Sequence, residues 1–125
     1  EGRTVPVDDV IAYCLAAIDE ANESGMYLLI EGIGGVMVPL DDTRTVADLI
    51  AGLGIPAIVV GGSYLGSLSH TLTACAALQS RRVPIDTVVI SETPGSEVPL
   101  SETRDTVARF LPNVPVEMIE FVPPV

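Results

Sequence analysis

The chain has 125 residues, enough for one domain, and 48% are hydrophobic while only 4% are aromatic, a composition typical of a parallel sheet covered by helices. Its 17 acidic residues outweigh 6 basic residues, all arginine, to give a net charge of -11, so partners among nucleic acids or anionic membrane surfaces are not expected. The two cysteines lack metal-ligand spacing, and there is neither a membrane-length apolar run nor a signal-peptide pattern, so we expect core cysteines and a cytoplasmic protein.

The first half of the chain predicts a helix, a buried strand and a second helix. Apolar residues recur at steps of three and four over residues 5–24, which predicts an amphipathic helix that ends near Gly25. Residues 26–30 form a short apolar run without polar alternation, typical of a strand buried on both faces. Residues 43–54 predict a short helix. Its expected caps are Asp42 or Thr43, and its expected stop signals are Gly52 and Gly54.

The second half alternates strands with helices. Strands are predicted at residues 56–62, 86–91 and 116–124, and helices at residues 66–82 and 99–112. The expected caps are Gly66 or Ser67 for the first helix and Ser101 for the second, and the side chains expected in the core include Leu65, Cys75 and Phe110. Regular alternation favours right-handed crossovers, so the sequence predicts an α/β fold with four parallel strands and flanking helices over residues 1–125.

Features that the sequence lacks also bear on the fold. The first predicted helix has no strand before it, and neither lysine nor the phosphate-binding pattern GxxxxGK[ST] occurs. A four-stranded parallel sheet would leave an edge and one flank uncovered, which is costly unless another polypeptide completes it. We therefore interpret the chain as part of a larger fold.

An acid and three glycines follow the predicted strand at residues 26–30. Ligands of open parallel sheets bind beyond the carboxyl ends of the strands, where Glu31 would lie. A carboxylate there suits Mg²⁺ beside nucleotide phosphates, and glycines let backbone N–H groups approach an oxyanion. The glycines concerned are Gly32, Gly34 and Gly35. Taken alone, the same stretch also fits an ordinary turn.

Two motifs in order resemble the dethiobiotin synthetase family: EGIGGVMVPLDD at residues 31–42 and GSYLGSLSHTLTACAAL at residues 62–78. The usual family forms are EGAGG, then apolar residues and PL with Asp, and later LG followed by HTL. The EGR start, TVADLI and VPLSET fit the same pattern, so the resemblance covers the whole chain but only about the C-terminal half of the family's domain. It implies a partial P-loop NTPase-type, doubly wound domain.

The resemblance implies an enzyme that uses ATP and Mg²⁺ to close the ureido ring of dethiobiotin on 7,8-diaminopelargonate and CO₂. The reaction passes through an N-carboxylate that is phosphorylated and then attacked by the neighbouring amine. Glu31 matches the metal-binding glutamate, and Glu31 with Gly34 would be catalytic. The implied nucleotide-binding residues are Glu31, Gly32, Ile33, Gly34, Ser91, Glu92, Val122, Pro123 and Pro124. The implied substrate-binding residues are Gly35, Gly66, Ser67, Ser69 and His70.

Several of these positions depart from the family's usual residues. The departures are Ile33 for alanine, Ser69 for asparagine, and Ser91 with Glu92 for an Asn-Asp pair near the adenine. For His70 we favour a hydrogen-bonded residue at a helix terminus or interface over a general base. Residues 122–124 fit an apolar shelf beside the purine and, equally, a strand end closed by prolines.

In the family, the N-terminal half supplies the P-loop lysine, a second acid for Mg²⁺ and a lysine for the carbamate. We therefore predict that this polypeptide alone does not turn over substrate and acts beside such a half, as a homodimer. An alternative is a non-catalytic dimerisation or regulatory module of the same lineage that uses the surface around residues 63–72. A related amidoligase or a partition-type ATPase would not explain the motifs together.

Overall fold

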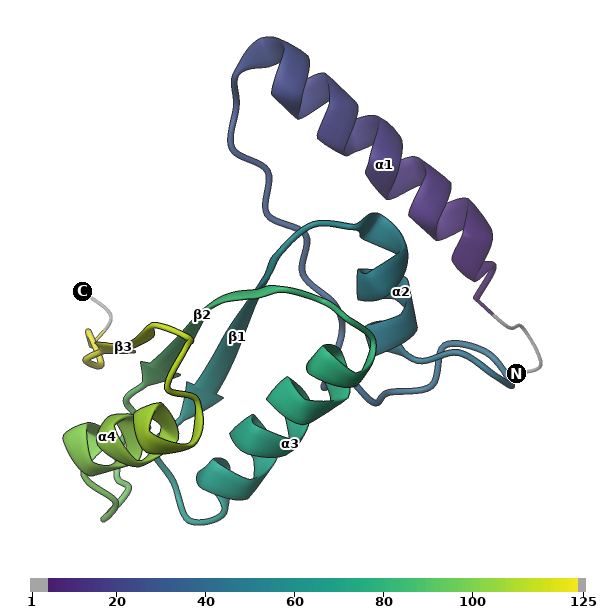
Figure 1. The fold of residues 1–125 in the computed structure, drawn as a ribbon. Coiled ribbons are helices and arrows are strands. Elements are labelled where there is room, and N and C mark those ends of the chain that lie inside the picture. The colour runs from purple at the N-terminus through teal and green to yellow at the C-terminus, as the bar shows by residue number, and fades with distance from the viewer. Residues whose placement is uncertain (1–4, 124–125) are drawn as a thin grey trace. The chain divides into compact units, whose positions relative to one another are not determined.

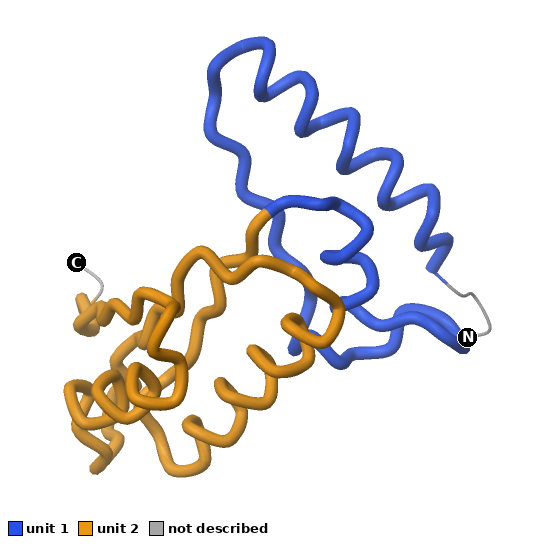
Figure 2. The backbone as a smooth tube through the Cα atoms, in the orientation of Figure 1, with its two compact units in different colours: residues 1–55 blue, residues 56–125 orange. Residues whose placement is uncertain are grey.

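The computed structural model describes residues 5–123, and the chain divides into two compact units between Ile55 and Pro56 (Figure 2). Unit 1 contains α1 (Val7–Ser24) and α2 (Val46–Leu53). Unit 2 contains β1 (Ala57–Gly62), α3 (Ser67–Ser80), β2 (Ile85–Ser91), α4 (Leu100–Phe110) and β3 (Val116–Ile119) (Figure 1). No helix within residues 5–123 is long and apolar enough to cross a membrane. That residues 1–125 make one domain stays a prediction.

Helix α1 ends at a glycine, as predicted. Gly25 has a φ of 65°, a left-handed conformation that glycine adopts without a steric penalty. The N–H of Met26 donates to the carbonyl oxygen of Ala21 at 2.9 Å, which satisfies one of the last free carbonyls of the helix. The prediction of a helix over residues 5–24 is confirmed.

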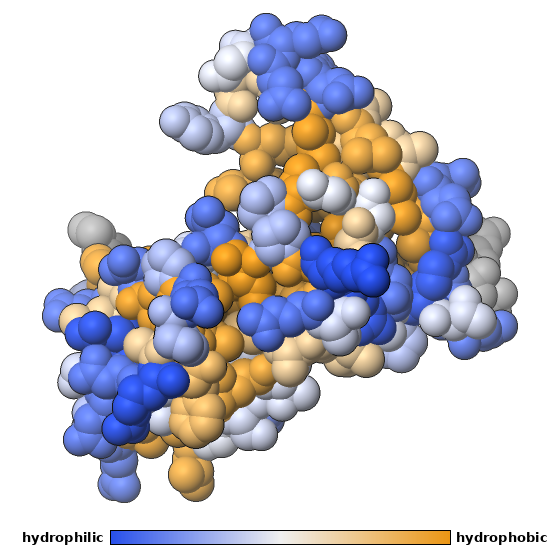
Figure 3. Space-filling model, viewed as in Figure 1, coloured by the Kyte–Doolittle hydropathy of each residue, from blue (hydrophilic) through white to orange (hydrophobic). Residues whose placement is uncertain are grey.

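The strand predicted at residues 26–30 is not formed, and the prediction of its burial is wrong. These residues are an irregular segment, and within the described chain no backbone hydrogen bond joins residues 27–30 to another segment. Leu29 is 85% exposed. A strand is stabilised by a neighbour that pairs with its backbone groups, and residues 5–123 provide none for this segment. Figure 3 shows apolar surface over α1 and the segment that follows it.

The cap of α2 is Thr45, so the predicted caps Asp42 and Thr43 are wrong. The carboxylate of Asp48 accepts hydrogen bonds from the backbone N–H and the hydroxyl of Thr45, both at 2.7 Å. Asp48 is the third residue of the helix, and this contact from its side chain back to the cap residue is characteristic of a capping box. Gly54 ends the helix with a φ of 65°, as predicted.

Gly52 lies inside α2, so its prediction as a stop signal is wrong. A Cβ added at this position would meet the Cδ1 atom of Ile11 at 2.7 Å. Glycine is therefore used here for the close approach of α1 and α2, and not for a turn.

Unit 2 contains a parallel sheet in the order β1-β2-β3. The predicted α/β class with a parallel sheet and flanking helices is confirmed, with three strands in residues 5–123 where four were predicted. Gly66 caps α3, as one of the two predicted alternatives. The cap of α4 is Pro99 and not Ser101, because the hydrogen bond from the N–H of Thr103 to the carbonyl of Pro99 starts the helix earlier.

Helices α3 and α4 cover one face of this sheet (Figure 1). Val59, Val88 and Ile90 point to that face and are buried. Ile58 and Val60 alternate with Val59, so they lie on the opposite face, where they are 51% and 69% exposed. The apolar sequence of residues 56–62 predicts a buried strand, and this prediction is wrong for the face of β1 opposite the helices.

Two side chains predicted to be in the core are exposed. Leu65 is 93% exposed because it precedes α3, where the helical period does not apply. Phe110 is the last residue of α4 and is 67% exposed, whereas Val107 in the turn before it is buried. The buried Cys75 agrees with its predicted place in the core, and burial raises the pKa of its thiol. Cys14 is half-buried on α1.

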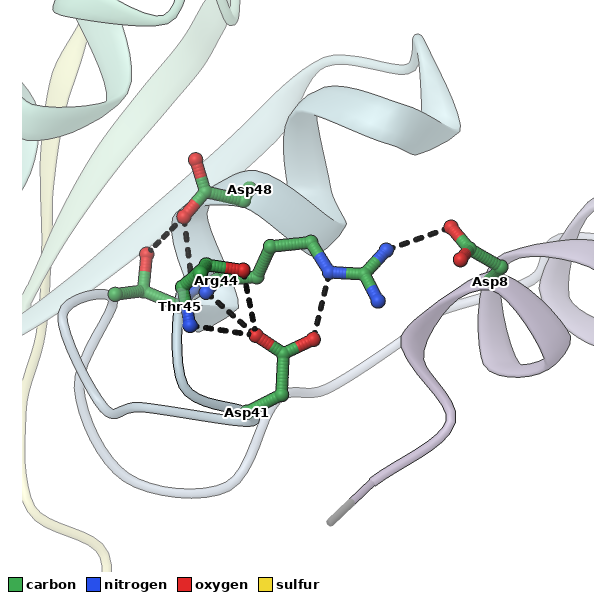
Figure 4. Close-up of polar contacts among 6 residues, drawn as sticks. Asp8, Asp41, Arg44, Thr45 and Asp48 are labelled. Atoms are coloured by element: carbon green, nitrogen blue, oxygen red, sulfur yellow. Dashed lines mark hydrogen bonds and ion pairs between the residues drawn. The ribbon is translucent and has the colours of Figure 1, made fainter.

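A polar network fixes the loop before α2 (Figure 4). The carboxylate of Asp41 accepts from the N–H of Thr43 at 2.9 Å and from the N–H and Nε of Arg44, both at 2.7 Å. Arg44 also donates to Asp8 on α1 at 2.6 Å. The N–H of Thr43, followed by the side chain of Arg44, lowers the pKa of Asp41 from 3.8 to about 2.

We predict that Asp41 makes the stability of unit 1 sensitive to acid. Because its pKa is lower in the folded chain than in the unfolded chain, its contribution is fully present above about pH 4 and is lost as the pH falls towards 2. Unfolding by urea, followed by circular dichroism between pH 2 and pH 7, should show a smaller acid-dependent loss for Asp41→Asn than for wild type. The exposed neighbour gives the control Asp42→Asn, and equal acid sensitivity in all three proteins would contradict the prediction.

Candidate functional site

In unit 1 the predicted metal-binding and catalytic residue Glu31 is exposed at the start of a glycine-containing loop. Within the described residues its carboxylate has no hydrogen bond or ion pair, and no group of three or more His, Cys, Asp or Glu side chains could hold a metal ion. Because the strand before it is not formed, Glu31 does not lie at a strand end as predicted. Its carboxylate is free to serve as a single ligand.

The loop after Glu31 is held on the first turn of α2. The N–H groups of Val46 and Ala47 donate to the carbonyls of Val38 and Val36 at 3.0 and 2.7 Å. The first turn of α2 thus satisfies loop carbonyls and leaves fewer N–H groups for an anion.

Two glycines of this loop are required by close packing. A Cβ at Gly32 would meet Cγ1 of Val46, and a Cβ at Gly34 would meet Cγ2 of Val38, each at 2.9 Å. Gly34 also has a φ of 71°, which favours glycine. Gly35 has open space around it, and Ile33 is exposed. The turn alternative considered for this stretch thus describes its local geometry.

In unit 2 the predicted substrate segment begins α3, just beyond the carboxyl end of β1. Ser67 is 1% exposed, and its Oγ has no hydrogen-bond partner within residues 5–123. Among the same residues, the N–H groups of Leu68 and Ser69 have no backbone acceptor, as expected for the first turn of a helix. Unpaired donors at a helix N-terminus suit a carboxylate or phosphate.

His70 lies in the first turn of α3, exposed, and its Nδ1 is 3.1 Å from the hydroxyl of Tyr64. The two rings are tilted by 56°, with centroids 6.1 Å apart. This contact agrees with the favoured interpretation of His70 as a hydrogen-bonded residue at a helix terminus.

The predicted nucleotide residues of unit 2 lie together at the carboxyl ends of β2 and β3. The backbone N–H of Glu92 donates to the carbonyl of Ile119 at 2.8 Å, and the carboxylate of Glu92 accepts from the N–H of Phe121 at 2.9 Å. These two bonds bring Val122 and Pro123, both exposed, next to the end of β2. Pro124 lies outside the described residues.

A second pair of hydrogen bonds joins the loops that follow β1 and β2. The N–H of Thr93 donates to Oγ of Ser63 at 3.0 Å, and the N–H of Ser63 donates to Oγ1 of Thr93 at 3.2 Å. Ser63 is 1% exposed. The segment that starts α3 and the segment after β2 are therefore tied to each other.

The structure gathers the predicted residues into two groups, one in each unit. Unit 1 holds residues 31–35. Unit 2 holds residues 66–70, 91–92 and 122–123 along the carboxyl edge of its parallel sheet. Sequence reasoning missed Ser63, Tyr64, Thr93 and Phe121, which orient the second group. Ser63 and Tyr64 lie within the quoted motif at residues 62–78, but nothing in it marks their contacts. The bonds of Ser63 to Thr93 and of Phe121 to Glu92 join positions 30 and 29 residues apart, so no local pattern predicts them.

Comparison with known proteins identifies the family of the chain. A family model described as an AAA domain matches residues 1–124. The chain is 46% identical over 114 residues to a protein named ATP-dependent dethiobiotin synthetase BioD from Acidiphilium cryptum, covering 91% of this chain and 50% of that protein. Proteins of the same name from Caulobacter sp. strain K31 and Anaeromyxobacter dehalogenans are 44% identical over 117 residues and 35% identical over 128 residues.

These two relatives are covered over 49% and 54% of their lengths, with 93% and 98% of this chain aligned. The chain therefore spans about half the length of the curated relatives it matches. The sequence resemblance to dethiobiotin synthetases is confirmed by these matches. The chain belongs to the AAA domain family whose model spans residues 1–124, and within that family its relatives are ATP-dependent dethiobiotin synthetases.

Proposed function

We propose that this chain is the C-terminal part of an ATP- and Mg²⁺-dependent dethiobiotin synthetase, a cytoplasmic homodimer that acts with an N-terminal P-loop half. The substrate would be 7,8-diaminopelargonate, one amine of which takes up CO₂ as a carbamate. The γ-phosphoryl group of ATP passes to the carbamate oxygen, and the second amine attacks the carbonyl carbon. Ring closure then expels phosphate and leaves dethiobiotin and ADP.

The observation that carries this proposal is the convergence of ligand-binding segments on one edge of the sheet in unit 2. The start of α3 and residues 91–92 and 122–123 follow three neighbouring parallel strands at their carboxyl ends. Open parallel sheets bind their ligands at that edge. The named relatives align with most of the chain, which supports the family resemblance from which these segments were identified.

For the metal, Glu31 supplies one oxygen ligand of the kind that Mg²⁺ prefers. Mg²⁺ is often held by one or two carboxylates together with water and phosphate oxygens, so a single exposed acid fits this role without a protein cage. Mg²⁺ would neutralise charge on the transferred phosphoryl group. The N–H groups of residues 32–34 would stabilise oxyanion charge in the same loop.

For the substrate, the start of α3 offers unpaired donors to the carboxylate tail. The buried hydroxyl of Ser67 lacks a partner within residues 5–123, and the N–H groups of Leu68 and Ser69 lack backbone acceptors there. We place the carboxylate tail of 7,8-diaminopelargonate against these donors. The neighbouring subunit would bind the rest of the substrate. For the nucleotide, exposed Val122 and Pro123 would form the apolar shelf under the base.

The need for a second half follows from charge and from unsatisfied apolar surface. The sequence has no lysine, whereas phosphoryl transfer depends on positive charge around the γ-phosphate. Residues 27–30 are apolar and form no backbone hydrogen bond to another segment of the described chain, as expected for a strand whose neighbours come from elsewhere.

Reconstitution tests the proposed function. The 125-residue chain is mixed with a separately produced N-terminal half of the Acidiphilium cryptum relative, in the presence of ATP, Mg²⁺, 7,8-diaminopelargonate and ¹³C-bicarbonate. We expect labelled dethiobiotin by mass spectrometry from the mixture and none from either part alone. A matched N-terminal half without its P-loop lysine serves as the control. Product from this chain alone, or none from the mixture, would contradict the proposal.

The dimerisation-module alternative rests on one observation, the exposure of Leu65 at the tip before α3. Leu65 is 93% exposed beside the exposed Tyr64, so an interface would have to be built around these two neighbouring side chains. The two functions are separated by the reconstitution above, since a dimerisation module would self-associate but would not restore ring closure.

A further inference from the structure

The two residues that follow β2, Glu92 and Thr93, make side-chain hydrogen bonds to two separate segments of unit 2 that are predicted to bind ligands. Glu92 holds the segment after β3 through the N–H of Phe121 at 2.9 Å. Thr93 holds the segment before α3 through its reciprocal bonds with Ser63 at 3.0 and 3.2 Å. Neighbouring residues of one turn thus fix the two segments in opposite directions along the sheet edge.

The contact of Glu92 uses its carboxylate on the protein itself. The same residue donates its own N–H to the carbonyl of Ile119 at 2.8 Å, so it brackets the end of β3 from both sides. A carboxylate that accepts a backbone N–H is a charge-assisted hydrogen bond, stronger than a neutral one. One carboxylate oxygen, Oε2, is engaged with the N–H of Phe121, so Glu92 holds the segment that carries Val122 and Pro123.

The contact of Thr93 is reinforced by close packing. A Cβ at Gly62 would meet Oγ1 of Thr93 at 2.9 Å and the ring of Tyr64 at 2.8 Å. The carbonyl of Tyr64 accepts from the N–H of Ser67 at 2.9 Å, which places the first residue of α3. Ser63 therefore connects Thr93 directly to the residues that set the N-terminus of α3.

We infer that Glu92 and Ser63 are positioning residues of two independent subsites, Glu92 for the nucleotide base and Ser63 for the carboxylate of the second substrate. The inference rests on the proposed function for the identity of the two ligands. It assigns to Glu92 a role different from reading the base: the side chain sets the backbone on which the base lies. Loss of either contact should weaken the binding of one ligand and leave the binding of the other unchanged.

The first test uses the 125-residue chain itself, by amide hydrogen exchange measured with NMR. We expect Glu92→Ala to speed exchange of the Phe121 amide by about tenfold, and Glu92→Gln to retain most protection because its amide oxygen still accepts. Ser63→Ala should speed exchange of the Thr93 amide instead. The exposed residues Glu97 and Ser101 give the matched controls Glu97→Ala and Ser101→Ala, which should change neither amide.

The second test uses the reconstituted enzyme. Glu92→Ala should raise KM for ATP by about tenfold. Its kcat and its KM for 7,8-diaminopelargonate should stay within about twofold of wild type. Glu92→Gln should have a KM for ATP close to that of wild type. Ser63→Ala should raise KM for 7,8-diaminopelargonate and spare KM for ATP.

The outcomes distinguish this inference from the proposed function. Unchanged exchange at Phe121 in Glu92→Ala would overturn the inference, as would faster exchange with an unchanged KM for ATP or a rise in both KM values together. If the wild-type mixture forms no dethiobiotin, the proposed function fails, and the exchange experiment still decides whether Glu92 and Ser63 hold their segments. Circular dichroism melting confirms that each variant is folded.

Discussion

Replacing Glu31 with glutamine is expected to lower kcat/KM of the reconstituted enzyme on the order of 10²-fold or more, without changing the stability of the chain. Glutamine keeps the size of the side chain but removes the negative charge that would hold Mg²⁺ beside the phosphates. Stability should not change because Glu31 is exposed and its carboxylate has no partner within the described residues. The measurements are dethiobiotin formation at several Mg²⁺ concentrations and urea unfolding of the 125-residue chain.

The expected signature is a higher Mg²⁺ requirement together with lower activity. Glu23→Gln, an exposed acid at the end of α1, is the matched control and should behave as wild type. If Glu31→Gln kept full activity at limiting Mg²⁺, the role of Glu31 as metal ligand would be refuted.

The largest effect on stability is expected from Gly61→Ala, which should lower the free energy of unfolding by about 1–3 kcal/mol through overpacking. Gly61 is in β1, and a Cβ there would collide with Oγ1 of Thr71 on α3 and approach Cδ1 of Ile90 at 3.4 Å. Thr71 is buried, so it has little room to move. Alanine restricts the unfolded chain more than glycine, so any net loss must come from the collision.

A double-mutant cycle isolates this collision. Thr71→Ala removes both the hydroxyl and the methyl that the new Cβ would meet. The combined variant should therefore be more stable than the sum of the single effects by about 0.5–3 kcal/mol, measured by urea unfolding. Additive effects of the two substitutions would show that β1 and α3 do not meet at Gly61.

The sequence by itself determined the alternation of elements in unit 2 and the ends of the helices. Strands β1 and β2 and helices α3 and α4 agree with the predicted ranges to within two residues at each end, whereas β3 ends at Ile119 and not at residue 124 as predicted. Gly25 and Gly54 end their helices as predicted, because a left-handed residue is a local requirement that glycine meets. Cys75 was placed in the core correctly by its helical period.

Some errors arose although the local signal was present. The pattern from Thr45 to Asp48 has the spacing of a capping box, yet the cap of α2 was predicted at Asp42 or Thr43. Ser101 was predicted as a cap from its residue type, and the helix starts at Leu100, immediately after Pro99.

For the candidate site, the sequence identified the segments and the tertiary structure decided how they are held. The motifs around Glu31 and Gly66 are read along the chain, and the named relatives confirm the family resemblance. The bonds of Glu92 to Phe121 and of Ser63 to Thr93 join residues 29 and 30 positions apart. Such pairs depend on which strands become neighbours in the sheet, and that information is not local.

The same reason explains the one predicted strand that did not form. The apolar composition of residues 26–30 favours burial in a sheet, but a strand forms only where a neighbouring strand pairs with its backbone. Residues 26–30 have no strand neighbour in the described chain, and the side chains of residues 26–29 are exposed. Composition and period thus determine what a segment is suited to become, and long-range pairing decides whether it does.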